Sequence, residues 1–119
     1  MRLAAIDIGT NTIRLLVADI LPDGTVHPVL ERQELPRLGK MVDRERRLLP
    51  DAMQRTVRIL DQFVETARAA GAKDILACGT SALRDAANRD DFVRLVLDRT
   101  GISIRVLSGA EEAERTYAG

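Results

Sequence analysis

Three short motifs in the 119-residue sequence carry residues that could bind phosphate or activate water. The first runs from Asp7 to Thr12 and follows a short apolar segment. Gly9 would let the backbone approach an anion, with successive amides of the bend pointing toward it. Thr10, Asn11 and Thr12 add side-chain donors, while the Asp7 carboxylate suits a hard cation such as Mg²⁺. The motif predicts phosphate and magnesium chemistry, although the same residues also suit an ordinary hairpin turn.

The second motif spans residues 79–84, where an apolar segment gives way to a predicted helix start. It would place backbone amides and the Arg84 guanidinium at the carboxyl edge of a sheet, which is where open α/β folds bind ligands. The alternative is that Thr80 or Ser81 merely caps the helix while Arg84 is a solvated surface residue. The motif by itself leaves both interpretations open.

The third motif, residues 108–112, begins with a serine and ends with two adjacent glutamates. Ser108 and Glu111 have the spacing of a capping box, so Glu111 has a structural task at the helix start. Glu112 points about 100° away around the helix and could face a cleft, where its carboxylate would orient or deprotonate a water. The alternative is a second acidic residue that is merely favourable at a helix amino terminus.

The elements that must position these motifs begin with three strands. Residues 3–8 and 13–20 are apolar runs on either side of the first motif, which is a hairpin pattern. Residues 25–35 predict a third strand, at a sheet edge or with a bulge, because Pro28 cannot donate to a central ladder. The polar, arginine-rich stretch 36–49 reads as a loop.

A helix is predicted from Pro50 to a stop at Gly71, since its apolar residues recur at spacings of four and three. Residues 74–78 form an apolar run too short for a helix, which predicts a parallel strand buried on both faces. Cys78, the single cysteine, is expected to be a buried free thiol in this strand. The residues expected on the buried stripe of the helix are Met53, Val57, Leu60, Val64 and Ala67.

The remaining residues predict a short helical stretch at 82–87, a second helix at about 90–99 ending at Gly101, a strand at 102–106 and a last helix from Ser108. The resulting order is β-β-β-α-β-α-β-α, which is the ribonuclease-H-like order. Right-handed crossovers then give an α/β fold with a mixed sheet and helices on its faces. The residues expected to face inward on the second helix are Phe92, Val93, Val96 and Leu97.

The overall composition excludes several classes of protein. Eighteen basic residues balance eighteen acidic ones, so no net field draws in DNA or another polyanion, and any anion site must be local. Asp7 interrupts what would be a signal-peptide core, and no segment approaches the roughly 20 apolar residues that span a bilayer. We expect a single domain with no DNA or membrane partner, located in a reducing cytoplasm.

Taken together and in this order, the motifs resemble the amino-terminal domain of the exopolyphosphatase and guanosine pentaphosphate phosphatase family. That family belongs to the actin-like, Hsp70-like and sugar-kinase-like superfamily. The resemblance covers the whole chain. It departs from the family pattern at Glu114, where the family usually has Arg, and nothing is carried over to that position. The residues that carry the resemblance lie at 4–12 with 14–15, at 37–39, at 79–88 and at 108–113.

The resemblance implies that residues 7–12 are the first phosphate loop, that Arg84 is an active-site cation and that Glu112 positions the attacking water. It implies a Mg²⁺-dependent hydrolase acting on inorganic polyphosphate or guanosine pentaphosphate, and the sequence does not separate these substrates. The alternative is a non-catalytic nucleotide-binding or assembly module of the same superfamily. A sugar or acetate kinase would need acceptor-binding residues that the sequence does not offer.

Family members continue into a second domain with a further phosphate loop, so residues 1–119 are expected to be one half of a two-domain, actin-like core. Such a half should fold but show no appreciable phosphatase activity, because the opposing phosphate loop and metal carboxylates are missing. The apolar surface left uncovered should lead to self-association, most simply as a homodimer.

Overall fold

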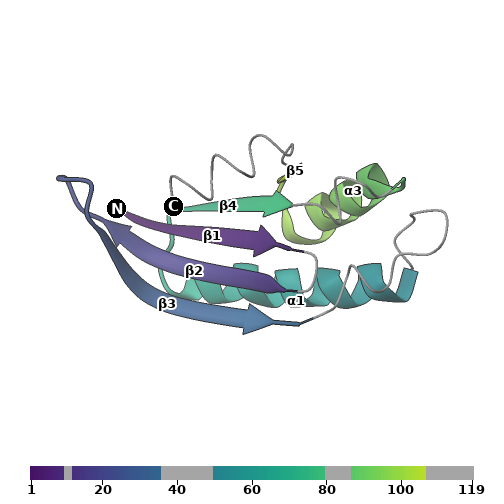
Figure 1. The fold of residues 1–119 in the computed structure, drawn as a ribbon, viewed down its shortest axis with the longest axis horizontal. Coiled ribbons are helices and arrows are strands. Elements are labelled where there is room, and N and C mark those ends of the chain that lie inside the picture. Colours follow the sequence, from purple (N-terminus) through teal and green to yellow (C-terminus); the bar gives the residue numbers. More distant parts are fainter. Residues whose placement is uncertain (10–11, 36–49, 80–86, 107–119) are drawn as a thin grey trace.

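The computed structural model describes residues 1–9, 12–35, 50–79 and 87–106. Figure 1 shows a sheet with helices packed against it. The predicted helical segments at 82–87 and from Ser108 lie wholly or largely outside the described residues. The described elements are β1 (Arg2–Ile8), β2 (Ile13–Ile20), β3 (Val26–Glu34), α1 (Pro50–Ala69), β4 (Asp74–Gly79), α3 (Arg89–Thr100) and β5 (Ile104–Val106).

The strands form one five-stranded mixed sheet in the order β3-β2-β1-β4-β5. The hairpin neighbours β1–β2 and β2–β3 pair antiparallel. The crossover neighbours β1–β4 and β4–β5 pair parallel, with α1 preceding β4 and α3 connecting it to β5. The predicted mixed α/β sheet is confirmed.

Strand β3 lies at the edge of the sheet and is almost wholly exposed. Its pairing with β2 shifts register between Val17 and Ala18, beside the pair formed by Ala18 and Pro28. Both features follow from the proline, which has no N–H to donate and is tolerated at edges and irregularities. The sequence predicted that this strand lies at an edge or contains a bulge, and β3 lies at the edge with an irregular register.

Helix α1 ends with a left-handed glycine. Gly71 has φ of 87°, and the amide of Ala72 donates to the carbonyl of Ala67 at 3.0 Å. Glycine adopts this left-handed conformation without the strain that a side chain would cause, and the conformation ends the helix. The predicted apolar stripe is confirmed, with Met53 half-buried and the other four residues buried. The helix also buries Ala52, Thr56 and Phe63.

Helices α1 and α3 pack on one face of the sheet, which we call the core face. Alternate strand residues point into this face, and Phe92 of α3 is fully buried against them. Among the described helices, none is long and apolar enough to cross a membrane. The strand residues of the core are Ala4, Ile6, Ile8, Ile13, Leu15, Val17, Ala77 and Ile104.

The remaining strand side chains form a second face, and this corrects the prediction that β4 is buried on both sides. Leu76 is 67% exposed, although β4 is an inner strand. Cys78, on the same side of β4, is half-buried rather than buried. Both described helices cover the core face, so these residues receive no cover from α1 or α3.

Leu97 of α3 was also predicted wrongly, since it is 46% exposed instead of facing inward. The buried residues of α3 are Phe92, Val96 and Thr100, which recur every four residues. Leu97 follows Val96 and therefore points about 100° away from this stripe. Thr100 takes the inward position because its hydroxyl is satisfied locally, donating to the carbonyl of Val96 at 2.7 Å.

Candidate functional site

One residue from each of the five strands lies in a single row across the second face, near the carboxyl ends of β1, β4 and β5. We call it the cross-strand row. Paired residues of neighbouring strands share a face, so the register alone places these side chains together. The row consists of Gln33, Arg14, Asp7, Cys78 and Arg105, each paired with the next.

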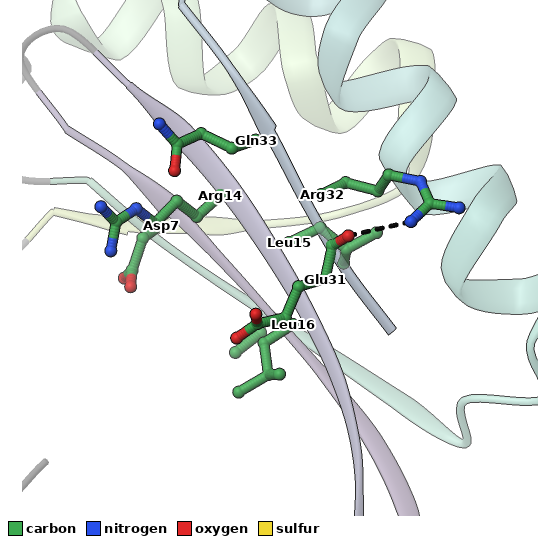
Figure 2. A pocket seen from close by; sticks show the side chains of 8 residues that line it. Asp7, Arg14, Leu15, Leu16, Glu31, Arg32 and Gln33 are labelled. Atoms are coloured by element: carbon green, nitrogen blue, oxygen red, sulfur yellow. Dashed lines mark hydrogen bonds between the residues drawn. The ribbon is translucent and has the colours of Figure 1, made fainter. Parts of the chain in front are cut away.

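Asp7 occupies the centre of this row, one residue before the end of β1. It is half-buried, and its Oδ1 atom is buried. Figure 2 shows Asp7 beside Arg14, with Gln33 on the next strand. These three residues, with Leu16 and Glu31, line a hollow of about 460 Å³ on the second face. The predicted metal ligand therefore lies in a concave, partly charged site.

The turn after β1 is closed by a backbone hydrogen bond. The Gly9 amide donates to the Thr12 carbonyl at 2.8 Å. This amide therefore closes the turn rather than pointing at an anion. Any anion bound here would depend on the other groups of the turn, among them the Thr12 hydroxyl. Thr10 and Asn11, which were also predicted to bind phosphate, lie outside the described residues.

The carboxyl ends of the parallel strands meet the starts of both helices at one edge of the sheet, as Figure 1 shows. Asn88, just before α3, donates from Nδ2 to the Met53 sulfur in the first turn of α1 at 3.9 Å. Gly79 and Val106 end their strands at this edge, and the segments carrying Arg84 and Glu112 continue from them. Both predicted catalytic residues lie outside the described residues, so their positions stay predictions.

Asp7 fits a magnesium site as one ligand. The part of the chain that the structure describes contains no group of three His, Cys, Asp or Glu side chains able to hold a metal. Magnesium needs no such group, because it commonly binds one or two carboxylates and completes its shell with phosphate oxygens and water. Asp7 supplies one such carboxylate, and a phosphate beside it would supply oxygens for the rest of the shell.

Comparison with known proteins decides the family. The profile of the Ppx/GppA phosphatase family matches residues 16–119. The chain belongs to this family. It is 40% identical over 126 residues to exopolyphosphatase 2 of Mycobacterium tuberculosis, covering 99% of this chain and 40% of that protein. It is 36% identical to a guanosine-5'-triphosphate,3'-diphosphate pyrophosphatase of Vibrio cholerae, covering 98% of this chain and 23% of that protein.

Solved structures agree with this assignment. A Ppx/GppA family member of Aquifex aeolicus superposes with a TM-score of 0.91 at 31% identity, covering 98% of this chain and 38% of that one. The ethanolamine utilization protein EutJ of Carboxydothermus hydrogenoformans shares only the fold, with a TM-score of 0.58 at 14% identity and coverage of 100% of this chain and 41% of that one. The chain thus spans about 40% of the length of the relatives first compared. The resemblance read from the sequence is confirmed.

Sequence reasoning missed most of the cross-strand row. The family motif includes Arg14 without a role, and the sequence motifs give no signal for Gln33, Glu31 or Arg105. The signal that could have found them is strand alternation, which puts Arg14 on the side of β2 opposite the buried Ile13 and Leu15. Alternation gives the side of a strand but not its neighbours, which only the sheet order supplies.

Proposed function

We propose that this chain is one half of a hydrolase that releases terminal phosphate from inorganic polyphosphate, guanosine pentaphosphate or both. The supporting observation is the position of Asp7, at the carboxyl end of β1 beside the Gly9–Thr12 turn. The chain belongs to the Ppx/GppA phosphatase family, and its relatives include proteins named exopolyphosphatase and guanosine-5'-triphosphate,3'-diphosphate pyrophosphatase. Carboxylates at the carboxyl ends of sheet strands are well placed for ligand chemistry.

Phosphoanhydride hydrolysis requires positioning and charge neutralisation more than covalent chemistry. Asp7 would hold Mg²⁺, which supplies positive charge to the phosphate oxygens when bound. Thr12 and its turn would hold a phosphate group, and Arg84 would add a second positive charge. Glu112 would orient the attacking water and accept its proton. The structure describes the positions of Asp7 and Thr12 but not those of Arg84 and Glu112. All four roles are proposed from the sequence motifs.

The relatives are more than twice as long as this chain. We propose that a second half, of similar fold, supplies the opposing phosphate loop and further metal carboxylates. Hydrolysis would then take place between the halves, and residues 1–119 alone would bind phosphate weakly and turn over little substrate. A cytoplasmic location and a homodimeric state of the chain are part of the same proposal.

The deciding experiment measures phosphate release by the purified full-length protein from long-chain polyphosphate and from guanosine pentaphosphate, with Mg²⁺ and with EDTA. We expect magnesium-dependent release from at least one substrate. Release that is unaffected by EDTA would contradict the role of Asp7. Binding of a nucleotide without release of phosphate would instead support a non-catalytic module of the same fold.

A further inference from the structure

The cross-strand row carries positive charge on both sides of Asp7. Arg14 precedes it on β2, and Arg105 follows on β5, separated from Asp7 only by Cys78. Both arginines are exposed. Arg14 lines the hollow around Asp7, whereas Arg105 stands outside it, on the opposite side of Asp7. The row therefore continues beyond the hollow that Asp7 lines.

Strand spacing sets the reach of this row. Neighbouring strands lie about 4.8 Å apart, so the backbones of Asp7 and Arg105 are separated by roughly 10 Å. Arg105 is on the second face because its partner Cys78 shares that face with Asp7, while the adjacent Ile104 is buried in the core. A long side chain at this point can meet a ligand that extends sideways from Asp7 over the carboxyl ends of the strands.

We propose that Arg105 binds a phosphate further along the polyphosphate chain than the one held at Asp7 and the Gly9–Thr12 turn. This inference rests on the proposed function. A linear polyanion presents negative charge on every unit, so it can engage cations in a line, and guanidinium groups suit phosphate oxygens. The chain has no net charge, so such binding must come from local cations.

The proposal makes Arg105 a binding residue that distinguishes substrates by length. A short substrate such as tripolyphosphate would occupy the region around Asp7 without extending to β5. A long chain would reach both positions. Loss of Arg105 should therefore weaken the binding of long chains selectively and leave the reaction at the terminal phosphate unchanged.

The test compares Arg105→Gln with Arg94→Gln in the full-length protein. Arg94 is an exposed arginine on α3, which covers the opposite face of the sheet, so it provides a matched loss of charge. For Arg105→Gln, we expect KM for long-chain polyphosphate to rise about 5- to 10-fold, as for loss of one charge-assisted contact. We expect kcat, and KM for tripolyphosphate, to stay within about twofold, whereas Arg94→Gln should change nothing.

A binding measurement separates this inference from the proposed function. Calorimetric titration with long-chain polyphosphate, in EDTA so that no turnover occurs, should show the same loss of affinity for Arg105→Gln. Arg105→Lys should retain part of the wild-type affinity, since the positive charge remains. If the wild type binds and hydrolyses polyphosphate but Arg105→Gln behaves like Arg94→Gln, or weakens short and long substrates equally, the inference is wrong and the function stands. If the wild type neither binds nor hydrolyses polyphosphate, the inference fails, and the proposed function fails with it only if guanosine pentaphosphate is not hydrolysed either.

Discussion

Arg2 and Asp19 join the first two strands through two parallel hydrogen bonds, Nε to Oδ1 at 2.8 Å and Nη2 to Oδ2 at 3.0 Å. Arg2 also donates from Nη1 to the carbonyl of Ala70 at 2.8 Å, beyond the end of α1. One guanidinium thus ties the hairpin to the helix at the edge of the sheet opposite to the candidate site. The hydrogen bonds from Arg2 lower the pKa of the Asp19 carboxyl below its usual 3.8.

This relationship predicts a pH dependence of folding. A carboxyl whose pKa is lower in the folded state stabilises that state fully above its unfolded pKa, and the contribution is lost as the pH falls through the folded pKa. The urea midpoint of the chain should therefore decrease below about pH 4. Asp19→Asn should lower the midpoint at pH 7 and flatten this acid-induced decrease. An unchanged pH profile in Asp19→Asn would show that Asp19 contributes nothing to it.

Two buried threonines should respond in opposite ways to the same substitution. Thr56 is fully buried, and among the described residues its hydroxyl has no hydrogen-bond partner. Thr100 is 6% exposed, and its hydroxyl donates to Val96 and accepts from the amide of Ile102 at 3.1 Å. Thr56→Val should stabilise the chain by about 1 kcal/mol, because an unsatisfied buried hydroxyl is removed.

Thr100→Val should destabilise the chain by about 1–2 kcal/mol, since it leaves the Ile102 amide without its acceptor. Urea denaturation of both variants measures the two free energies of unfolding under the same conditions. Equal signs for the two substitutions would mean that side-chain packing, and not hydrogen bonding, controls these positions.

Substitution of the two candidate site carboxylates, Asp7 and Glu112, should lower activity without destabilising the fold. In the full-length protein, Asp7→Asn and Glu112→Gln should each lower kcat for polyphosphate by at least about 100-fold, with the melting temperature little changed. Asp74→Asn serves as the control, because Asp74 is exposed at the opposite end of β4. Turnover within threefold of wild type in Glu112→Gln would remove Glu112 from the mechanism.

The isolated chain should self-associate and release little phosphate. Leu76, 67% exposed on an inner strand, marks apolar surface that an association could cover. Light scattering over a concentration series should show a dimer, and Leu76→Lys should shift it toward monomer. Leu97→Lys, on α3 and 46% exposed, is the matched control and should not. A monomer at all concentrations would contradict the exposed-surface argument, and sustained phosphate release would show that one half suffices.

The sequence predicted those features that depend on neighbouring residues. The apolar runs on either side of the Asp7–Thr12 turn predicted a hairpin, and the structure has one. Pro28 predicted an irregular edge strand, which is β3. Gly71 predicted the helix end, where the structure has a left-handed glycine. These predictions succeeded because each rests on backbone preferences that tertiary contacts did not override.

Features that depend on distant parts of the chain were not predictable in this way. The apolar run around Leu76 looked buried on both sides, because the sequence does not say which face of the sheet each helix covers. Leu97 was predicted to face inward because it is apolar, but the buried stripe of α3 runs through Phe92, Val96 and Thr100. The proximity of Asp7, Cys78 and Arg105 could be predicted only from the strand order, in which β4 pairs with β1 although more than sixty residues separate the two strands.

The sheet separates stability from chemistry, because the core face holds the packed side chains while the cross-strand row lies on the second face. Substitutions at Gln33, Arg14 or Arg105 should therefore have little effect on the folding free energy. If these residues contact the phosphate substrate as proposed, they could change without destabilising the fold. A lineage could then alter the length or type of phosphate substrate that it prefers and retain the same scaffold. Relatives named exopolyphosphatase 2 and guanosine-5'-triphosphate,3'-diphosphate pyrophosphatase both align with nearly the whole of this chain.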